Sequence, residues 1–253
     1  MAGPLSSNGV TYSIIDELTS APYVHMTINL MKKYGITVQN ENDKVFKVPA
    51  GKYKSPGTIY IEGDASSASY FLAGAAITGG TVTVHGCGSD SIQGDARFAK
   101  VLEKMGAKVT FGPNSITLSR VEGTRLIGID EDCGDIPDVA MTLAIVGMFA
   151  EGKTTIRNVY NWRVKETERM VAMVTELTKL GVFVEEGRDY LVVHGVKPGQ
   201  VRSNVEIETY DDHRVAMCFS LAACAGVPVT ILDPGCTSKT FPDYFQRLAE
   251  LSS

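Results

Sequence analysis

The densest group of residues that could do chemistry lies at positions 161–169, with the sequence Asn-Trp-Arg-Val-Lys-Glu-Thr-Glu-Arg. It contains the only tryptophan of the chain, three cations and two carboxylates. If a helix begins near Val164, Lys165 and Arg169 lie on one face, where like charges repel by roughly 0.2–0.5 kcal/mol. Two interpretations stay open: the two glutamates offset this repulsion at a solvated helix start, or an anionic ligand supplies the missing negative charge.

Arg214 and Lys239 also stand at the start of expected helices. The dipole of a helix presents positive potential at its N-terminus, so a cation there is disfavoured unless a carboxylate neutralises it or an anion shares the site. Asp211 and Asp212 precede Arg214 and leave both explanations open. Lys239 directly precedes the last expected helix. The apolar stripe of that helix consists of Phe241, Phe245 and Leu248.

Three aspartates indicate an internal repeat. Asp64, Asp138 and Asp212 stand at equal steps of 74 residues (64 to 138 and 138 to 212), and each opens an alanine-rich segment that leads into a β-rich run. Equal steps of this size predict a supersecondary unit that is used repeatedly. An aspartate at a helix start is most often an N-cap, so a capping role and a chemical role both stay open for each of them.

A second series of positions interleaves with the first. Three expected helices end with a lysine in the last turn and a glycine, at Gly35, Gly106 and Gly181. The lysine complements the helix dipole, and the glycine can adopt the left-handed conformation beyond the helix end. Short β-rich runs follow these glycines, at residues 36–38, 107–110 and 182–184.

The two series together predict α/β units of the form strand–helix–strand–helix–strands, with helices covering one face of a sheet. Helix starts in such a repeat face the same side. We therefore expect the cations to converge on one cleft that binds phosphate or carboxylate. Asp138 and Glu166 come from the same edge and are candidates for the base and the acid. The four converging cations are Lys165, Arg169, Arg214 and Lys239.

The composition restricts the class of protein. The net charge of −5 and the lack of a basic stripe argue against nucleic-acid binding, and no apolar run approaches the roughly 20 residues that span a bilayer. Five scattered cysteines without a C-x-x-C pair and four distant histidines predict neither disulfides nor a metal site. Residues 1–5 lack the features of a signal peptide. The expected location is the cytoplasm, with a plastid as the alternative if a transit peptide precedes the chain.

One stretch, Pro49–Gly57, has the composition of a linker. It fits a crossover or hinge between domains and fits a plain surface loop equally well.

Four segments of the chain closely resemble 5-enolpyruvylshikimate-3-phosphate synthase of the enolpyruvyl transferase family, a shikimate-pathway enzyme of aromatic amino-acid biosynthesis that glyphosate inhibits. They occur in the family's order and span almost the whole chain. The related enzyme that transfers enolpyruvyl to a UDP-sugar carries different residues there. The four segments are residues 63–72, 161–167, 211–214 and 236–242.

The resemblance implies a fold of two domains, each of three βαβαββ units, in an inside-out α/β barrel arrangement across a cleft. On this basis residues 1–62 are the end of the family's second domain, and residues 63–253 are the bulk of the first. The Lys-Ser, Asn-Ala-Gly-Thr and Ser-Ser-Gln segments of the family's N-terminal portion have no counterpart. We therefore expect a fold incomplete at the N-terminus, a chain inactive by itself and a complementary N-terminal half as its partner.

The resemblance also implies a reaction and roles for individual residues. The family joins shikimate 3-phosphate to phosphoenolpyruvate and expels phosphate, without a metal or cofactor. Asp138 corresponds to the base for the shikimate hydroxyl, and Glu166 to the residue that exchanges protons at the methylene carbon. Arg169 and Arg214 correspond to the clamp on the phosphoenolpyruvate carboxylate. The remaining implied contacts are Lys239 beside its phosphate, Ser20, Tyr23, Asn161 and Lys165 at shikimate 3-phosphate, and His213 as a neighbour of open role.

Two other classes of function compete with this one. The first is an anion-binding or complementation module that keeps the cleft edge without turnover. The second is RNA binding, because related βαβαββ units occur in RNA-associated proteins, but the acidic net charge disfavours it. Sensitivity to glyphosate is left open by these residues.

Overall fold

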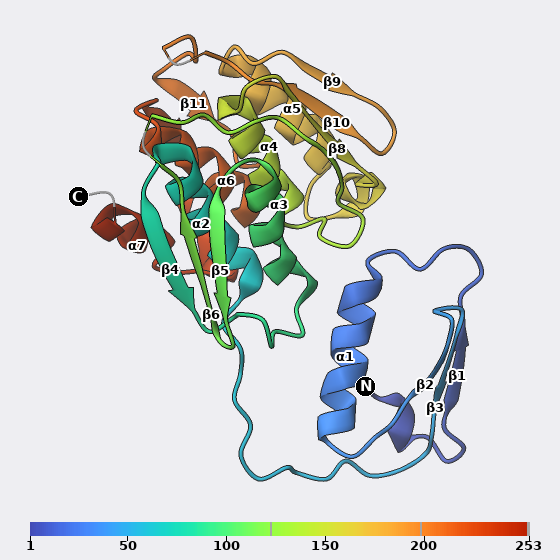
Figure 1. The fold of residues 1–253 in the computed structure, drawn as a ribbon. Coiled ribbons are helices and arrows are strands. Elements are labelled where there is room, and N and C mark those ends of the chain that lie inside the picture. The colour runs from blue at the N-terminus through green and yellow to red at the C-terminus, as the bar shows by residue number, and fades with distance from the viewer. Residues whose placement is uncertain (122, 198, 252–253) are drawn as a thin grey trace. The chain divides into compact units, whose positions relative to one another are not determined.

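The computed structural model describes residues 1–121, 123–197 and 199–251. The chain forms two compact units, Met1–Glu62 with Ile92–Gly94, and Gly63–Ser91 with Asp95–Ser253 (Figure 1). Each unit has its own hydrophobic core. The boundary after Glu62 falls beyond the stretch with linker composition, whose backbone at Lys54 donates to the Tyr34 carbonyl of the first unit. None of the described helices is long and apolar enough to span a bilayer.

The first unit is a small antiparallel sheet with one helix. Its strands β1 (Val10–Ser13), β2 (Gln39–Glu41) and β3 (Val45–Val48) pair in the order β1-β3-β2. The helix α1 (Ala21–Lys33) joins β1 to β2, and a short 3₁₀ helix, η1 (Gly3–Leu5), precedes them. The core of this unit consists of Met31, Ile36, Val38, Phe46 and Val48.

Three helices form the centre of the second unit. They are α2 (Ala65–Thr78), α4 (Ala140–Phe149) and α6 (His213–Cys224), and each packs against the other two. Figure 1 shows them side by side, with the sheets on the outside. Their alanines lack bulky side chains and allow this close approach, so the centre is buried almost completely.

The sheets of the second unit surround these helices. One has the order β4-β6-β5 and another the order β7-β8-β10-β9, while β11 and β12 form a parallel pair. The strand bounds are β4 (Thr81–His85), β5 (Lys108–Gly112), β6 (Ser115–Ser119), β7 (Asp130–Asp132), β8 (Lys153–Arg157), β9 (Val184–Glu186), β10 (Leu191–His194), β11 (Val205–Ile207) and β12 (Val229–Ile231). The outer helices are η2 (Gly94–Arg97), α3 (Phe98–Lys104), η3 (Tyr160–Val164), α5 (Arg169–Lys179), η4 (Pro234–Lys239) and α7 (Tyr244–Leu251).

The predicted repeat is confirmed. The sheets β1-β3-β2, β4-β6-β5 and β8-β10-β9 have the same order, and in each a helix joins the first strand to the hairpin. The glycines that end these helices have the expected left-handed backbone, with φ of 82° at Gly35, 109° at Gly106 and 82° at Gly181. The strand expected at residues 36–38 is wrong: β2 begins at Gln39, and Ile36 and Val38 instead fill the core of the first unit.

Several expected helix starts also differ from the structure. Asp64 and Asp212 cap α2 and α6, and their side chains accept backbone N–H groups. Asp138 is not at an N-cap position, because α4 begins at Ala140 with Val139 as its N-cap residue. The last helix, α7, begins at Tyr244. Lys239 is instead the last residue of the short helix η4, and residues 240–243 separate it from α7.

Candidate active site

The loop that carries Lys165 and Glu166 is held at one end by the cap of α5 and at the other by the buried Trp162. The expected helix start near Val164 is wrong: η3 ends there, and α5 begins at Arg169, where Glu168 caps the helix by accepting from the Val171 backbone. The cap satisfies one of the donors that a helix N-terminus leaves open. Lys165 and Arg169 are therefore not on one helix.

The tryptophan fixes the other end of this loop. Trp162 is fully buried in η3, and its indole N–H donates to the Pro137 carbonyl at 2.7 Å. Because Pro137 directly precedes Asp138, this bond ties the 160–168 loop to the segment that presents Asp138. Asn161 lies beside Trp162 and is also buried.

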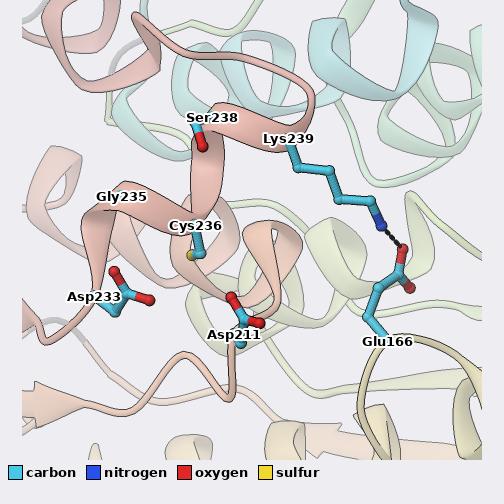
Figure 2. A pocket seen from close by; sticks show the side chains of 7 residues that line it. All are labelled: Glu166, Asp211, Asp233, Gly235, Cys236, Ser238 and Lys239. Atoms are coloured by element: carbon cyan, nitrogen blue, oxygen red, sulfur yellow. Dashed lines mark hydrogen bonds and ion pairs between the residues drawn. The ribbon is translucent and has the colours of Figure 1, made fainter.

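A pocket of about 480 Å³ opens beside the loop (Figure 2). Lys239 extends from η4 across one side of it and pairs with Glu166. Burial opposes ionisation of Glu166, but the contacts with Lys239 and Arg169 outweigh it and lower its pKa to about 2. Glu166 is therefore ionised at neutral pH and must take up a proton before it can donate one. The pocket is lined by Glu166, Asp211, Asp233, Gly235, Cys236, Ser238 and Lys239.

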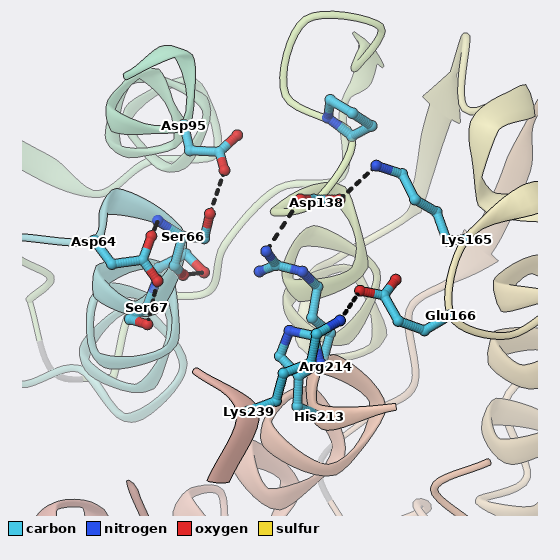
Figure 3. A network of polar contacts seen from close by, with 12 residues as sticks. Asp64, Ser66, Ser67, Asp95, Asp138, Lys165, Glu166, His213, Arg214 and Lys239 are labelled. Carbon is cyan, nitrogen blue, oxygen red and sulfur yellow. Dashed lines mark hydrogen bonds and ion pairs between the residues drawn. The ribbon is translucent and has the colours of Figure 1, made fainter. Parts of the chain in front are cut away.

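Asp138 is the centre of the polar network next to this pocket (Figure 3). Its Oδ1 accepts from Arg169 at 3.0 Å and lies 3.6 Å from the Lys165 ammonium. Its Oδ2 accepts from Arg214 at 3.0 Å. Three cations from the loop, α5 and α6 thus meet one carboxylate at the start of α4. The structure brings these predicted residues together as the repeat required.

Arg169 is the most buried cation of the network, with 1% of its side chain exposed. Its Nε donates at 2.7 Å to Asp212, which is fully buried, and its Nη2 donates at 2.7 Å to Glu166. Burial disfavours the charged guanidinium, but Asp212 and then Asp138 raise the pKa of Arg169 above its usual value. A buried charge needs this kind of pairing.

Arg214 occupies the first turn of α6, as expected, but its neutralising partner comes from another repeat. The expected partners were Asp211 and Asp212, whereas the guanidinium donates to Asp138 and to the Tyr70 hydroxyl at 3.4 Å. Burial opposes the charge of Arg214, yet Tyr70 and Asp138 raise its pKa. Its Nε is buried and has no hydrogen-bond partner within the described part of the chain.

His213 is a buried neighbour of the network. Its Nδ1 lies 3.6 Å from Asp212, too far for a hydrogen bond. Burial and the nearby charge of Arg214 lower the pKa of His213 to about 4, so the ring is neutral at pH 7.

The network has more positive than negative groups among the ion pairs that the structure shows. In these pairs four cations share three carboxylates. Asp95 also acts on Arg214, and Asp211 and Asp233 line the adjacent pocket. The cations are Lys165, Arg169, Arg214 and Lys239, and the carboxylates are Asp138, Glu166 and Asp212.

Ser20 and Tyr23 belong to the first unit, at the start of α1, where the Tyr23 backbone donates to the Ser20 carbonyl at 3.1 Å. Their place beside the network of the second unit stays a prediction.

Tyr70 lies in the segment 63–72, but its contact with Arg214 was not expected. Asp212 was expected as a helix cap, which is correct, but its pairing with Arg169 was not expected. In the described part of the chain no cluster of His, Cys, Asp and Glu side chains could hold a metal ion.

Comparisons with known proteins agree on one family. A family model described as EPSP synthase (3-phosphoshikimate 1-carboxyvinyltransferase) matches residues 1–248. Proteins named 3-phosphoshikimate 1-carboxyvinyltransferase from Brassica napus (chloroplastic) and Yersinia pseudotuberculosis are each 58% identical to the chain. The alignments cover the whole chain but 50% of the first protein and 58% of the second. The chain thus spans about half the length of the curated relatives it matches.

Solved structures give the same result. The EPSP synthase from Acinetobacter baumannii matches with a TM-score of 0.77 and 25% identity, over 100% of this chain and 58% of that one. The enolpyruvyl transferase NikO from Streptomyces tendae shares the fold, with a TM-score of 0.74 at 19% identity. The chain belongs to the EPSP synthase (3-phosphoshikimate 1-carboxyvinyltransferase) family.

Proposed function

We propose that this chain supplies the acid–base residues and the cationic side of the active site of a 3-phosphoshikimate 1-carboxyvinyltransferase. The observation that carries the proposal is the meeting of Lys165, Arg169 and Arg214 at Asp138, with Glu166 and its own cation beside them. The transfer needs a base, an acid and cations around two anionic substrates, and this network contains all of these groups.

The substrates of the proposed reaction are shikimate 3-phosphate and phosphoenolpyruvate. Asp138 takes the proton of the attacking shikimate hydroxyl, and Glu166 moves a proton at the methylene carbon. Arg169 and Arg214 hold the carboxylate of phosphoenolpyruvate, with Lys239 at its phosphate. The groups assigned to shikimate 3-phosphate are Asn161, Lys165, Ser20 and Tyr23. His213, which is neutral at pH 7, is a neighbour that adds no charge.

The ion pairs explain how Glu166 becomes an acid. Without substrate, Lys239 and Arg169 hold its pKa at about 2. Phosphoenolpyruvate brings a phosphate and a carboxylate that compete for these same two cations. Once both cations bind the substrate, Glu166 loses the two contacts with side chains that lower its pKa. Its burial then raises the pKa toward the range of a general acid.

We further propose that residues 1–62 belong to the family's second domain and residues 63–253 to its first. The division of the structure after Glu62 supports this boundary. The rest of the family's fold, carried in the same polypeptide or by a separate chain, is the expected partner. Cytoplasm stays the predicted compartment and a plastid the alternative.

Phosphate release tests the proposal. The 253-residue chain is assayed with both substrates, alone and mixed with the N-terminal portion of the Yersinia relative. We expect release only in the mixture, and Asp138→Asn to lower it by about a hundredfold or more. Asp130→Asn is the matched control, because Asp130 lies in an exposed pair with Arg157 and its loss should change the rate by less than about twofold. A folded complex without release, or equal rates for both variants, would contradict the proposal.

The convergence of four cations also fits a simpler function, an anion-binding module. Calorimetry with phosphoenolpyruvate separates the two. Binding by the mixture without any phosphate release would favour the module.

A further inference from the structure

A strained turn directly precedes α6. Tyr210 and Asp211 both have φ of 54°, in the left-handed region that bulky residues rarely adopt. Two such residues in sequence persist only where the surroundings hold them, and this kind of strain gathers at functional sites. The next residue is Asp212, the partner of Arg169, and Asp211 itself lines the pocket beside Glu166 (Figure 2).

A buried carboxylate holds this turn. Glu176 of α5 is fully buried, and the Tyr210 hydroxyl donates to its Oε1 at 2.7 Å. The Glu208 backbone N–H donates to its Oε2 at 3.3 Å, and the Lys179 ammonium lies 2.8 Å away. A fully buried carboxylate is stable only when donors satisfy it. Burial and the contact with Glu176 raise the pKa of Tyr210 to about 12, so its hydroxyl remains a donor at neutral pH.

The same helix contacts the turn region twice. Arg169 and Glu176 are seven residues apart on α5, which is two helical turns, so they lie on one face. Arg169 binds Asp212, and Glu176 binds Tyr210 two residues earlier. The position of Asp212, and with it the geometry of the Arg169 guanidinium, therefore depends on how firmly Glu176 holds the turn.

We propose that Glu176 and Tyr210 are positioning residues: they hold the left-handed turn at Tyr210–Asp211 and so place Asp212 against Arg169. Neither residue is assigned contact with substrate. The role of the pair as a clamp on Arg169 stands on the geometry, and only its consequence for catalysis rests on the proposed function.

The first test uses Tyr210→Phe, which removes one hydroxyl and keeps the ring. Hydrogen exchange of the Arg169 Nε–H is measured by NMR in the folded chain. The Arg120 Nε–H serves as the internal reference, because it donates to the Ala76 carbonyl near the C-terminus of α2. We expect exchange at Arg169 to accelerate about fivefold or more relative to Arg120. If the ratio of the Arg169 exchange rate to the Arg120 exchange rate is the same in variant and wild type, the proposal is overturned, even if the variant melts at a lower temperature.

Two further variants complete this test. Glu176→Gln keeps an acceptor for Tyr210 but turns an amide donor toward the Glu208 N–H, so we expect an acceleration greater than that of Tyr210→Phe. Tyr190→Phe is the control, because Tyr190 is 40% exposed and lies in the loop between β9 and β10. An acceleration at Arg169 in the control as large as that in Tyr210→Phe would also overturn the proposal.

Kinetics of the mixture with the N-terminal portion of the Yersinia relative provide the functional arm. For Tyr210→Phe we expect the KM of phosphoenolpyruvate to rise about fivefold or more while that of shikimate 3-phosphate changes less than about twofold. Equal changes in both values would contradict a specific effect through Arg169. If the mixture has no activity at all, the proposed function fails, and the exchange measurement still decides the role of Glu176 and Tyr210.

Discussion

Replacing Asp212 by asparagine isolates the charge of the Arg169–Asp212 pair. Asp212 has two roles: it caps α6 through the Arg214 N–H, and it accepts from the buried Arg169 at 2.7 Å. Asparagine caps a helix as well as aspartate does, so the variant keeps the first role and loses only the second. Asp64 offers a matched control, because it caps α2 in the same position of the repeat but is exposed. Among the described residues its side chain accepts hydrogen bonds from Ser66 and Ser67, in the first turn of its own helix.

The magnitude follows from the burial of the pair. Removing one partner of a buried ion pair costs roughly 3–5 kcal/mol. Arg169 keeps its contacts with Asp138 and Glu166, so we expect Asp212→Asn to lower the free energy of unfolding by about 3 kcal/mol, the lower end of this range. For Asp64→Asn we expect less than about 0.5 kcal/mol.

Thermal unfolding and urea titration measure the difference. For a unit of this size about 3 kcal/mol corresponds to a fall in Tm of roughly 6–12 °C. Circular dichroism at 222 nm follows the helices, and both variants are compared under identical buffer conditions. Equal stabilities of Asp212→Asn and Asp64→Asn would refute the reasoning, because they would mean that the buried Arg169–Asp212 pair does not stabilise the fold.

Three other perturbations test separate parts of the structure. Trp162→Phe leaves the Pro137 carbonyl without its donor and should lower the free energy of unfolding in urea by roughly 1–3 kcal/mol. A loss below about 0.5 kcal/mol would contradict a stabilising role of this hydrogen bond. Because the pKa of His213 is lowered to about 4 from 6.5, the unfolded chain binds the proton first, and stability should fall as the pH drops from 6.5 toward 4. The urea midpoint should therefore depend less on pH in His213→Asn than in the wild type. An equal pH dependence of the midpoint in both proteins would contradict the role of His213. Gly106→Ala, at φ of 109°, should destabilise the fold by about 1 kcal/mol. Gly74→Ala inside α2 should stabilise it by a similar amount. A melting temperature of Gly106→Ala equal to or above that of Gly74→Ala would contradict these backbone roles.

The repeat was predictable because local chemistry repeats with it. A lysine followed by a glycine predicts a helix end in every copy of the repeat. The left-handed backbone at Gly35, Gly106 and Gly181 confirms this prediction. The convergence of cations was predicted from their places at or near helix starts of successive units. In the structure Arg169 and Arg214 lie in the first turns of α5 and α6, whereas Lys165 lies in a loop and Lys239 ends η4. The predicted strand at residues 36–38 failed because a short apolar run fits a packed loop as well as a strand.

The role of each charged residue was less predictable, because its partner comes from another repeat. Asp138 looks like Asp64 and Asp212 in sequence, yet it binds Arg214, 76 residues away, and is not at the N-cap position of α4. The choice between capping and ion pairing depends on where the partner arginine lies in space. No local pattern contains that information, and the same holds for the contact of Tyr70 with Arg214, 144 residues apart.

Glu166 is the residue on which the proposed function depends most, because it is proposed to move the proton at the methylene carbon. Its role can be measured by NMR in D₂O, as deuterium incorporation into the methylene group of phosphoenolpyruvate. The sample contains shikimate 3-phosphate and the chain mixed with the N-terminal portion of the Yersinia relative, and binding of phosphoenolpyruvate is checked by calorimetry. We expect incorporation with the wild-type chain and a loss of about tenfold or more with Glu166→Gln at retained binding. Incorporation at the same rate in Glu166→Gln would contradict the account.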